Sequence, residues 1–380
     1  MPSLIWLLLL FITLTTACPS PNHTLHLQNR SPWFSIGNSH GTEPYSNNAW
    51  PPHTAAPWDR PLCYCFVKQT DYTALNNLLK SAIKLWEPAM TPYSSLKIIP
   101  DCGRAKVDCL CEKAAPDSLH ISDVDPSDGN VHGMTTVGYW HQRPEQHTRG
   151  RHIIAFERLE NRNDPSKPGP YDVATLAHEI GHALGLEHEH TRPDRDEYIS
   201  FYCNNLRDYE DVKRRIQQSG SGDTIQKACT DHATAHKYSF SAFAFLKTPT
   251  RAPSIGQFAW SGKTFDFESL MIYGSYEGAT IPSGQNDKSK TVMLKHPRSK
   301  TWRANPGLEE EFFGGGYAEA VRRKPSEGDL ARVAQLYPNY GPKDKGDPGD
   351  ARAGQEKWAG TSGGLEGRGW MVAVETGRGM

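Results

Sequence analysis

A set of histidines at helical spacing constrains this chain more than any other feature. Apolar side chains recur three or four residues apart between positions 171 and 184, at Val173, Leu176, Ile180 and Leu184. This period predicts an amphipathic helix with one buried face. His178 and His182 lie four residues apart on it, so their side chains project from one side at about 40° to each other. Two imidazoles in this arrangement can bind one metal ion.

A carboxylate, a glycine and a third histidine complete the motif H-E-x-x-H-x-x-G-x-x-H. Glu179 lies where a carboxylate can reach a water on the metal. Gly185 allows the backbone to leave the helix, and a turn there can return His188 as a third ligand. The composition gives this motif by chance with an expectation of roughly 10⁻⁴. We therefore prefer a metal site to a helix that carries ordinary surface histidines.

This donor set predicts one catalytic Zn²⁺ ion. Three neutral imidazoles suit tetrahedral zinc and leave one position open. Bound zinc lowers the pKa of a water towards ~7 and polarises a substrate carbonyl. Glu179 is then the expected general base and acid, taking the water proton during attack and returning it to the leaving amine. An apposed tyrosine could donate to the developing oxyanion. His190 falls outside the ligand spacing and is expected to support the site or the fold.

Residues 178–196, HEIGHALGLEHEHTRPDRD, resemble the signature of the metzincin zinc endopeptidases, and among them the astacin family. Glu189, directly after the third histidine, is the astacin choice at that position. The resemblance implies that this glutamate binds the new N-terminus of the mature enzyme through a buried contact. Residues 269–273, SLMIY, are similar to the family's methionine turn beneath the zinc. By that resemblance Met271 supports the ligating histidines, and Tyr273 reaches the zinc and stabilises the transition state.

The resemblance extends over residues 61 to 337 and implies an α+β, metzincin-like fold in two subdomains. The upper one would hold a twisted mixed sheet and the zinc-binding helix. The lower one, after His188, would be an irregular C-terminal subdomain, and residues 325–337 resemble the closing helix of the catalytic domain. Substrate would lie extended across the cleft and pair with an edge strand, for which residues 135–139 are the candidate.

Two departures from the family pattern bear on specificity and latency. The gap between His188 and Met271 is longer than typical, so we expect an insertion that contains Cys203 and Cys229 at the lower wall of the cleft. Family members are usually kept latent by a pro-segment aspartate that ligates zinc. Residues 34–38, FSIGN, resemble that motif only loosely and end in Asn38. Latency by this route is therefore not expected.

Composition divides the 380 residues into four parts. Residues 1–17 contain an apolar run followed by small residues and predict a signal peptide; the alternative is a membrane anchor, although the run is about half of the ~20 residues that span a bilayer. Residues 18–60 are a pro-segment or an extended N-terminal arm. Residues 61–340 form the catalytic domain, with a helix predicted over 74–86 and strands over 118–124, 135–139 and 152–156. The Gly-rich tail, 341–380, is predicted to be disordered.

Eight cysteines in a secreted chain indicate disulfides. Cys203 and Cys229 form one plausible pair. A second group contains Cys63, Cys65, Cys102, Cys109 and Cys111, with Cys18 as a possible sixth member. The rival interpretation is a zinc site built from the two C-x-C pairs. Two N-glycosylation triplets begin at Asn22 and Asn29.

The charges are nearly balanced, with 42 positive and 43 negative side chains, so a nucleic-acid or anionic-membrane partner has no support. We expect a secreted, extracellular, monomeric zinc metalloendopeptidase that cleaves protein or peptide substrates, without stable membrane insertion. One alternative is a secreted zinc-binding homologue that acts in adhesion or binding without proteolysis; the intact Glu179 argues against it. Another is a metzincin of a different subfamily, and Glu189 argues against that.

Overall fold

The computed structural model describes ten segments of the chain: residues 49–52, 60–90, 94–101, 109–124, 133–139, 148–247, 265–281, 287–297, 309–314 and 323–339. The predicted signal peptide, both glycosylation triplets, residues 34–38 and the tail 341–380 lie outside the described residues. Among the helices of the described segments, none is long and apolar enough to cross a membrane.

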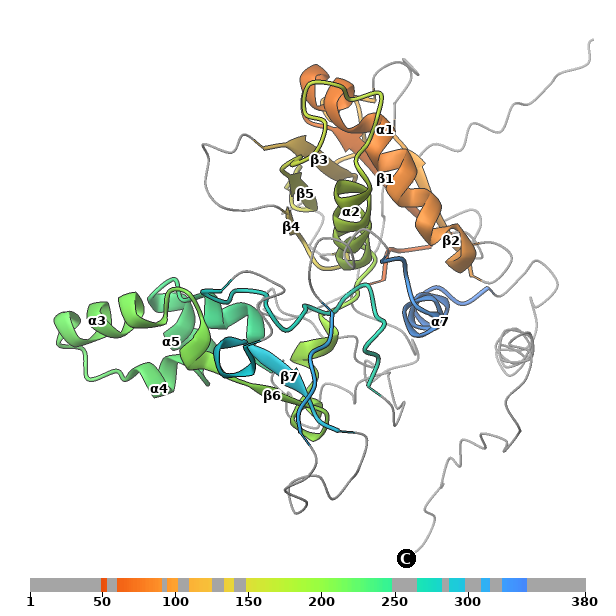
Figure 1. Cartoon of the computed structure of the whole chain (residues 1–380). Coiled ribbons are helices and arrows are strands. Elements are labelled where there is room, and N and C mark those ends of the chain that lie inside the picture. Colours follow the sequence, from red (N-terminus) through yellow and green to blue (C-terminus); the bar gives the residue numbers. More distant parts are fainter. Residues whose placement is uncertain are drawn as a thin grey trace, which may run out of the picture.

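A five-stranded mixed sheet forms one part of the molecule, in the order β2-β1-β3-β5-β4 (Figure 1). The strands are β1 (Arg60–Phe66), β2 (Leu96–Pro100), β3 (Leu119–Asp123), β4 (Gly133–Thr135) and β5 (Ile153–Phe156). Neighbouring strands pair in parallel except β4, which runs antiparallel to β5 at one edge. The interior strand β1 is buried along almost its whole length, as expected for a strand covered on both faces. The predicted α+β fold with a mixed sheet is confirmed.

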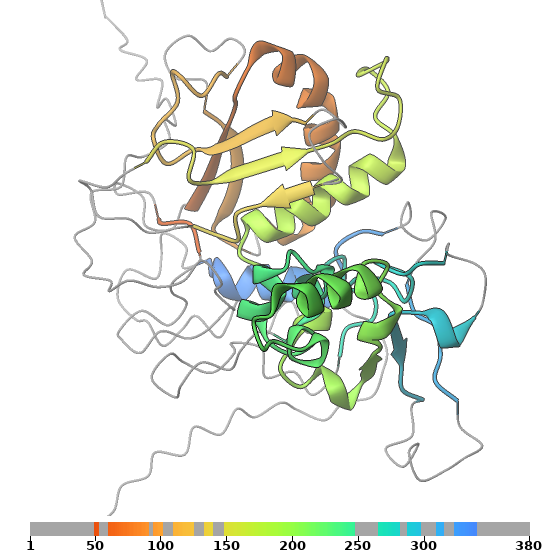
Figure 2. The same ribbon diagram turned by 90° about the vertical axis from the view of Figure 1, so that its left-hand side faces the viewer.

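Two helices pack against each other beside this sheet, α1 (Gln69–Trp86) and α2 (Pro170–Ala183) (Figure 2). The helix predicted over residues 74–86 begins earlier because the Asp71 carboxylate accepts a hydrogen bond from the Lys68 backbone N–H at 3.0 Å, which satisfies a donor at the helix start. At its other end Trp86 is fully buried, and its indole N–H donates to the Ala177 carbonyl at 2.9 Å. This bond joins α1 to the predicted zinc-binding helix.

The predicted strands at 118–124 and 152–156 correspond to β3 and β5. The strand predicted at 135–139 is displaced towards the N-terminus, because β4 covers Gly133–Thr135. Gly138 lies beyond its end with φ 62°, and its backbone N–H donates to the His182 carbonyl at 2.8 Å. The chain therefore turns from the sheet to the end of α2 where the sequence pattern suggested continued strand.

The part after His188 consists of short elements joined by loops and has its own apolar core. It contains α3 (Tyr209–Ser219), α4 (Ile225–Ala228), α5 (His232–Lys237), β6 (Ile199–Phe201) and β7 (Met293–Lys295), the last two paired antiparallel. A disulfide joins Cys203 to Cys229, as predicted. Figure 1 shows α3, α4 and α5 projecting together away from the sheet, so the predicted insertion is a small disulfide-linked helical unit.

A C-terminal helix and an N-terminal segment close the core around the end of α2. Helix α7 (Glu327–Leu336) lies below α2 in Figure 1 and is followed by Tyr337. The buried Tyr337 hydroxyl donates to the Leu184 carbonyl at 2.8 Å. Trp50 is also buried, and its indole N–H donates to the Ala183 carbonyl at 2.8 Å. The core thus includes Trp50, which lies within the 18–60 segment of the sequence outline.

Candidate active site

The structure brings His178, His182 and His188 together. The first two lie on consecutive turns of α2, and the third lies in the loop that follows it. Gly185, with φ 101°, reverses the chain there, a conformation that glycine adopts without steric cost. The Nε2 atom of His188 then lies 3.1 Å from the Nε2 of His178 and 3.1 Å from that of His182. Three nitrogen atoms from one short stretch of chain therefore converge on one point.

The hydrogen bonds of the outer ring nitrogens determine what the inner ones can do. His178 Nδ1 lies 2.8 Å from the Leu270 carbonyl, and His182 Nδ1 lies 2.8 Å from the Leu186 carbonyl. A carbonyl oxygen can only accept, so both Nδ1 atoms carry protons and both Nε2 atoms present bare lone pairs. Burial lowers the pKa of His178 to about 3 and that of His182 to about 4, which keeps these rings neutral.

The cluster fits a tetrahedral zinc ion. His178 and His182 each direct an Nε2 lone pair at His188 Nε2. A proton on His188 Nε2 could point at only one of these two atoms. At least one pair of nitrogens therefore faces each other, lone pair against lone pair, with no proton between them. A cation at the centre removes this repulsion. For Zn–N bonds of 2.0–2.1 Å, tetrahedral geometry places ligand nitrogens about 3.3 Å apart, close to the observed 3.1 Å. Carbonyl bonds to the outer nitrogens are also the usual support for ligating histidines.

Glu179 lies beside this cluster and is buried. One carboxylate oxygen, Oε2, accepts a hydrogen bond from the Thr135 hydroxyl on β4 at 2.5 Å. The other, Oε1, lies over Gly133, where an added Cβ atom would approach it to 2.3 Å. Burial raises the pKa of Glu179 to about 7, and the Thr135 hydrogen bond partly offsets that rise. A carboxyl group that titrates near neutral pH is suited to general acid–base chemistry.

Met271 lies under α2, as the resemblance implied, and is fully buried. It packs so closely on Gly181 that a Cβ atom there would lie 2.4 Å from the methionine sulfur. The turn is held by α7, because the Asp329 carboxylate accepts from the Ser269 hydroxyl at 2.6 Å and from the Leu270 N–H at 2.7 Å. The same Leu270 supplies the carbonyl that orients His178.

Tyr273 also lies at the cluster. Its ring centroid is 4.4 Å from that of His188 and 4.5 Å from that of His190. Burial raises the pKa of its hydroxyl, with further contributions from Glu277 and Glu179, so the phenol remains a donor. His190 uses both ring nitrogens in the fold: Nε2 lies 3.0 Å from the Ala244 carbonyl, and Nδ1 accepts from the Tyr273 N–H at 3.2 Å. It is therefore not available as a ligand.

Sequence reasoning missed several residues that hold the site. Thr135 and Gly133 contact the base from a strand more than 40 positions upstream, and nothing in the local sequence indicates that contact. Asp329 did have a signal, because Ser326 and Asp329 form a capping box at the start of α7. That pattern predicts a helix start but not the second use of the carboxylate at the methionine turn.

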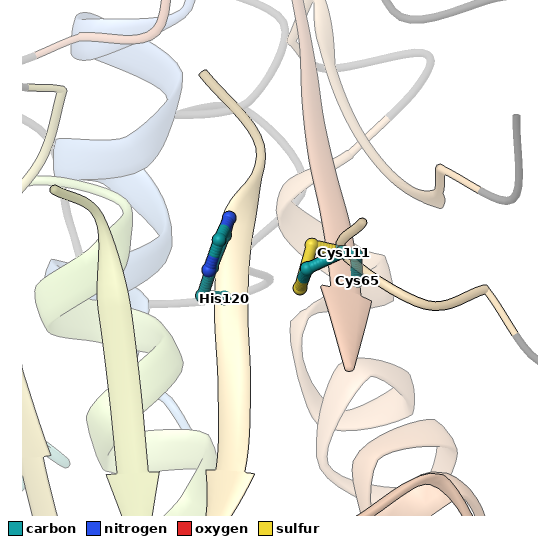
Figure 3. Close-up of side chains that lie close together, drawn as sticks. All are labelled: Cys65, Cys111 and His120. Atoms are coloured by element: carbon teal, nitrogen blue, oxygen red, sulfur yellow. A yellow bond between two sulfur atoms is a disulfide. The ribbon is translucent and has the colours of Figure 1, made fainter. Parts of the chain in front are cut away.

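A second cluster, Cys65, Cys111 and His120, has donor atoms close enough for a metal. Figure 3 shows Cys65 of β1 joined to Cys111 by a disulfide, with His120 on the neighbouring strand β3. Cys63 and Cys109, which complete the two C-x-C pairs, are disulfide-bonded as well. A disulfide leaves no thiolate for a metal. The rival interpretation of a zinc site in these pairs is therefore wrong.

Comparisons with known proteins agree with this geometry. Residues 167–255 match the sequence model of the astacin peptidase family. Astacin-like metalloprotease toxin 5 of Loxosceles gaucho is 32% identical over 108 residues, which are 28% of this chain and 38% of that protein. Zinc metalloproteinase nas-15 of Caenorhabditis elegans is 25% identical over 260 residues, 66% of this chain and 42% of that protein. The chain thus spans less than half the length of each of these relatives.

A solved structure resembles the chain over a larger share of its length. High choriolytic enzyme 1, a hatching enzyme zinc-protease from Oryzias latipes, matches with a TM-score of 0.41 and 14% sequence identity. The match covers 76% of this chain and 94% of the other.

Proposed function

We propose that the protein is a zinc-dependent endopeptidase of the astacin family, on the match of residues 167–255 to the sequence model of that family and on the geometry of the histidine cluster. One observation carries the proposal: three Nε2 atoms converge on one point, two of them as bare lone pairs, and the buried carboxylate of Glu179 lies beside them. A zinc-binding site without proteolysis would not need a buried carboxylate beside the three imidazoles. The non-proteolytic alternative is therefore not favoured.

In this proposal His178, His182 and His188 hold the ion. Zn²⁺, when bound there, supplies Lewis acidity towards a carbonyl oxygen and makes a water easier to deprotonate. Glu179 accepts the proton of the attacking water on Oε1, since Oε2 is engaged by Thr135. It then delivers that proton to the departing amine nitrogen. The Tyr273 hydroxyl donates a hydrogen bond to the oxygen on which negative charge develops.

The edge strand β4 is the proposed binding surface for an extended peptide. It lies at the edge of the described sheet and carries Thr135, which contacts the base. An exposed edge offers unpaired N–H and C=O groups to a peptide strand. Met134, on the same strand, is 51% exposed and provides an apolar surface beside that edge. Protein or peptide substrates that bind as an added strand are therefore the proposed class.

We further propose that the protein is secreted as a monomer after removal of residues 1–17. The disulfides Cys65–Cys111 and Cys203–Cys229 support an oxidising environment, and one relative is named as a toxin. The proposed catalytic domain spans residues 61–340, supplemented by the buried segment at Trp50. The tail from residue 341 lies outside it.

The test compares wild-type protein with Glu179→Gln on a denatured protein substrate, and measures bound zinc in both. We expect equal zinc content and a loss of kcat/KM of about 10²–10⁴-fold, the usual contribution of a general base. Glu268→Gln, on an exposed carboxylate, is the matched control and should behave as wild type. Equal activity in Glu179→Gln would overturn the mechanism. A zinc-loaded wild type without peptide-bond turnover would instead favour the binding protein.

A further inference from the structure

His190 is a fully buried side chain beside the histidine cluster, and no step of the proposed reaction uses it. Its ring packs on two rings that the reaction does use. The centroid of His188 lies 4.9 Å away and that of Tyr273 lies 4.5 Å away, each at an interplanar angle of 28°. His190 therefore contacts both the third proposed zinc ligand and the tyrosine proposed to stabilise the oxyanion.

The two hydrogen bonds of the His190 ring fix its tautomer. Nε2 lies 3.0 Å from the Ala244 carbonyl oxygen, which can only accept, so Nε2 carries the proton. Nδ1 lies 3.2 Å from the Tyr273 backbone N–H, which can only donate, so Nδ1 presents a lone pair. Moving the proton to Nδ1 would break both bonds. The Ala244 carbonyl therefore makes His190 an acceptor for Tyr273.

The peptide group between Ile272 and Tyr273 is held at both of its polar ends. Its N–H donates to His190 Nδ1, and its carbonyl oxygen accepts from Nη1 of Arg323. Because a peptide group is planar, bonds at its two opposite edges fix its rotation about the chain direction. That rotation determines the direction in which the Tyr273 side chain leaves the backbone. The bond to His190 therefore helps to aim the phenol at the histidine cluster.

The carbonyl that fixes His190 belongs to a short 3₁₀ helix, η7 (Ser241–Phe245). The ring of Phe245, the last residue of this helix, packs on His190 and on Tyr273, with both centroids 5.6 Å away. A further link comes from the buried Arg195, whose Nη1 donates to the His190 carbonyl at 3.0 Å and also to the Phe245 carbonyl. The end of η7 is thus attached to His190 through both backbone and side chains.

The start of η7 is attached to the disulfide-linked helical unit. The carboxylate of Asp208, the residue before α3, accepts from the Ser241 N–H at 2.8 Å and from the Ser241 hydroxyl at 2.5 Å. Helix α5 of the same unit packs against η7. A continuous set of contacts therefore runs from the helical unit through η7 to His190 and Tyr273.

We propose that His190 is a positioning residue that sets the orientation of Tyr273, and that the helical unit holds His190 in the required tautomer through Ala244. This rests on the proposed function, in which the Tyr273 hydroxyl donates to the developing oxyanion. Losing the bond to Tyr273 should lower kcat more than it raises KM, because that donation is made only in the transition state. Zinc retention should change little, since the ring nitrogens of His190 are engaged by Ala244 and Tyr273.

The first experiment separates the two bonds by substitutions at position 190. His190→Phe keeps a stacking ring without donor or acceptor. His190→Asn offers an amide oxygen at about the reach of Nδ1 and can still accept from Tyr273, whereas the longer His190→Gln offers its amide at about the reach of Nε2, towards Ala244. We expect kcat to fall by about 10–100-fold in His190→Phe, on the order of the cost of a 1 Å misplacement. His190→Asn should recover more of this loss than His190→Gln.

Zinc retention is measured in the same variants by competition with a chromogenic chelator. It should stay within about threefold of wild type, below the ~10–100-fold cost of removing an outer-shell hydrogen-bond partner of a ligand. His236→Phe makes the same substitution at an exposed histidine of α5 that packs on Phe243, and should leave zinc retention and kcat unchanged. A kcat loss that only follows zinc loss, or a His190→Asn no better than His190→Phe, would overturn the proposal.

A double-mutant cycle distinguishes positioning from a general effect on the fold. Tyr273→Phe removes the hydroxyl and should lower kcat by about 10²–10³-fold, the usual cost of losing one oxyanion donor. Adding His190→Phe to Tyr273→Phe should then lower kcat by less than about threefold, because no hydroxyl remains to be oriented. Two losses that simply multiply would show that His190 acts on something other than Tyr273.

Amide hydrogen exchange at Tyr273 tests the bond without any turnover. It is measured in zinc-loaded Glu179→Gln, which also prevents self-cleavage. In that background His190→Phe should speed exchange of the Tyr273 N–H by about tenfold or more, the order expected for the loss of one buried hydrogen bond, and His190→Asn should restore protection. Unchanged exchange would refute the positioning role. A wild type that binds zinc but cleaves nothing would instead refute the proposed function, while the exchange result would still decide whether His190 holds Tyr273.

Discussion

Replacing Thr135 with valine tests whether the edge strand controls the base. The Thr135 hydroxyl donates to Glu179 Oε2 at 2.5 Å, and this carboxylate is otherwise desolvated by burial. Valine has nearly the shape of threonine but has no donor. The change therefore removes one hydrogen bond to the ionised carboxylate while the packing of β4 on α2 is kept.

The magnitude follows from the charge on the acceptor. A hydrogen bond to a charged group contributes about 1.5–3 kcal/mol, and one pKa unit corresponds to about 1.36 kcal/mol. Losing the bond disfavours the ionised form, so the pKa of Glu179 should rise by about 1–2 units. The base must be ionised to accept a proton. Activity should therefore fall on the acidic side and recover at higher pH.

The assay is the pH profile of kcat/KM with zinc present throughout. In Thr135→Val the acidic limb should move upward by about 1–2 pH units, and Thr135→Ser should return it close to wild type. Thr136→Val makes the same substitution at the next residue, whose hydroxyl donates to the Arg151 carbonyl instead, and should leave the limb in place. A Thr135→Val profile that is merely scaled down, with an unmoved limb, would refute the reasoning.

Three further outcomes follow from the packing and the covalent links. Gly181→Ala should destabilise the fold by about 1–3 kcal/mol through overpacking, since the new methyl group would meet the Met271 sulfur at 2.4 Å; an unchanged thermal midpoint would contradict this. Replacing Cys203 and Cys229 by serine opens a link across 26 positions and should cost about 3–4 kcal/mol in denaturant unfolding, whereas a loss below about 1 kcal/mol would show that the helical unit is held mainly by its core. Chelation should abolish turnover and lower the thermal midpoint, and added zinc should restore both; activity that survives chelation would exclude the metal mechanism.

The sequence predicted the features that depend on residues close together in the chain. The period of apolar residues along α2 placed the helix within one residue at each end, and the ligand spacing on it follows from 3.6 residues per turn. The Cys203–Cys229 pair was predictable because the two cysteines bracket one polar segment. The start of α1 was harder to predict, because there the Lys68 backbone N–H donates to the Asp71 carboxylate and the N-cap residue is not the usual Ser or Thr.

The remaining features depend on contacts between distant parts of the chain. β4 ends early because Gly138 bonds to the His182 carbonyl, which no pattern around residue 135 could indicate. One partner of the buried Glu189 carboxylate, Arg332 on α7, lies 143 positions away in the sequence. In each case the missing information is which buried polar group lies opposite another after folding, and this depends on the packing of whole elements.

The end of α2 shows how such contacts prepare the ligand set before any ion arrives. The last four carbonyls of a helix have no partner within it, and frayed carbonyls here would let His182 move. In this chain each of them has a donor: Leu184 N–H for Ile180, Leu186 N–H for Gly181, Gly138 and Gly185 N–H for His182, and the Trp50 indole for Ala183. Two of these donors, Gly138 and Trp50, come from distant segments, so the terminus is held by the tertiary fold as well as by its own turn. Because the end of α2 is already ordered, metal binding to its histidines loses little further conformational entropy.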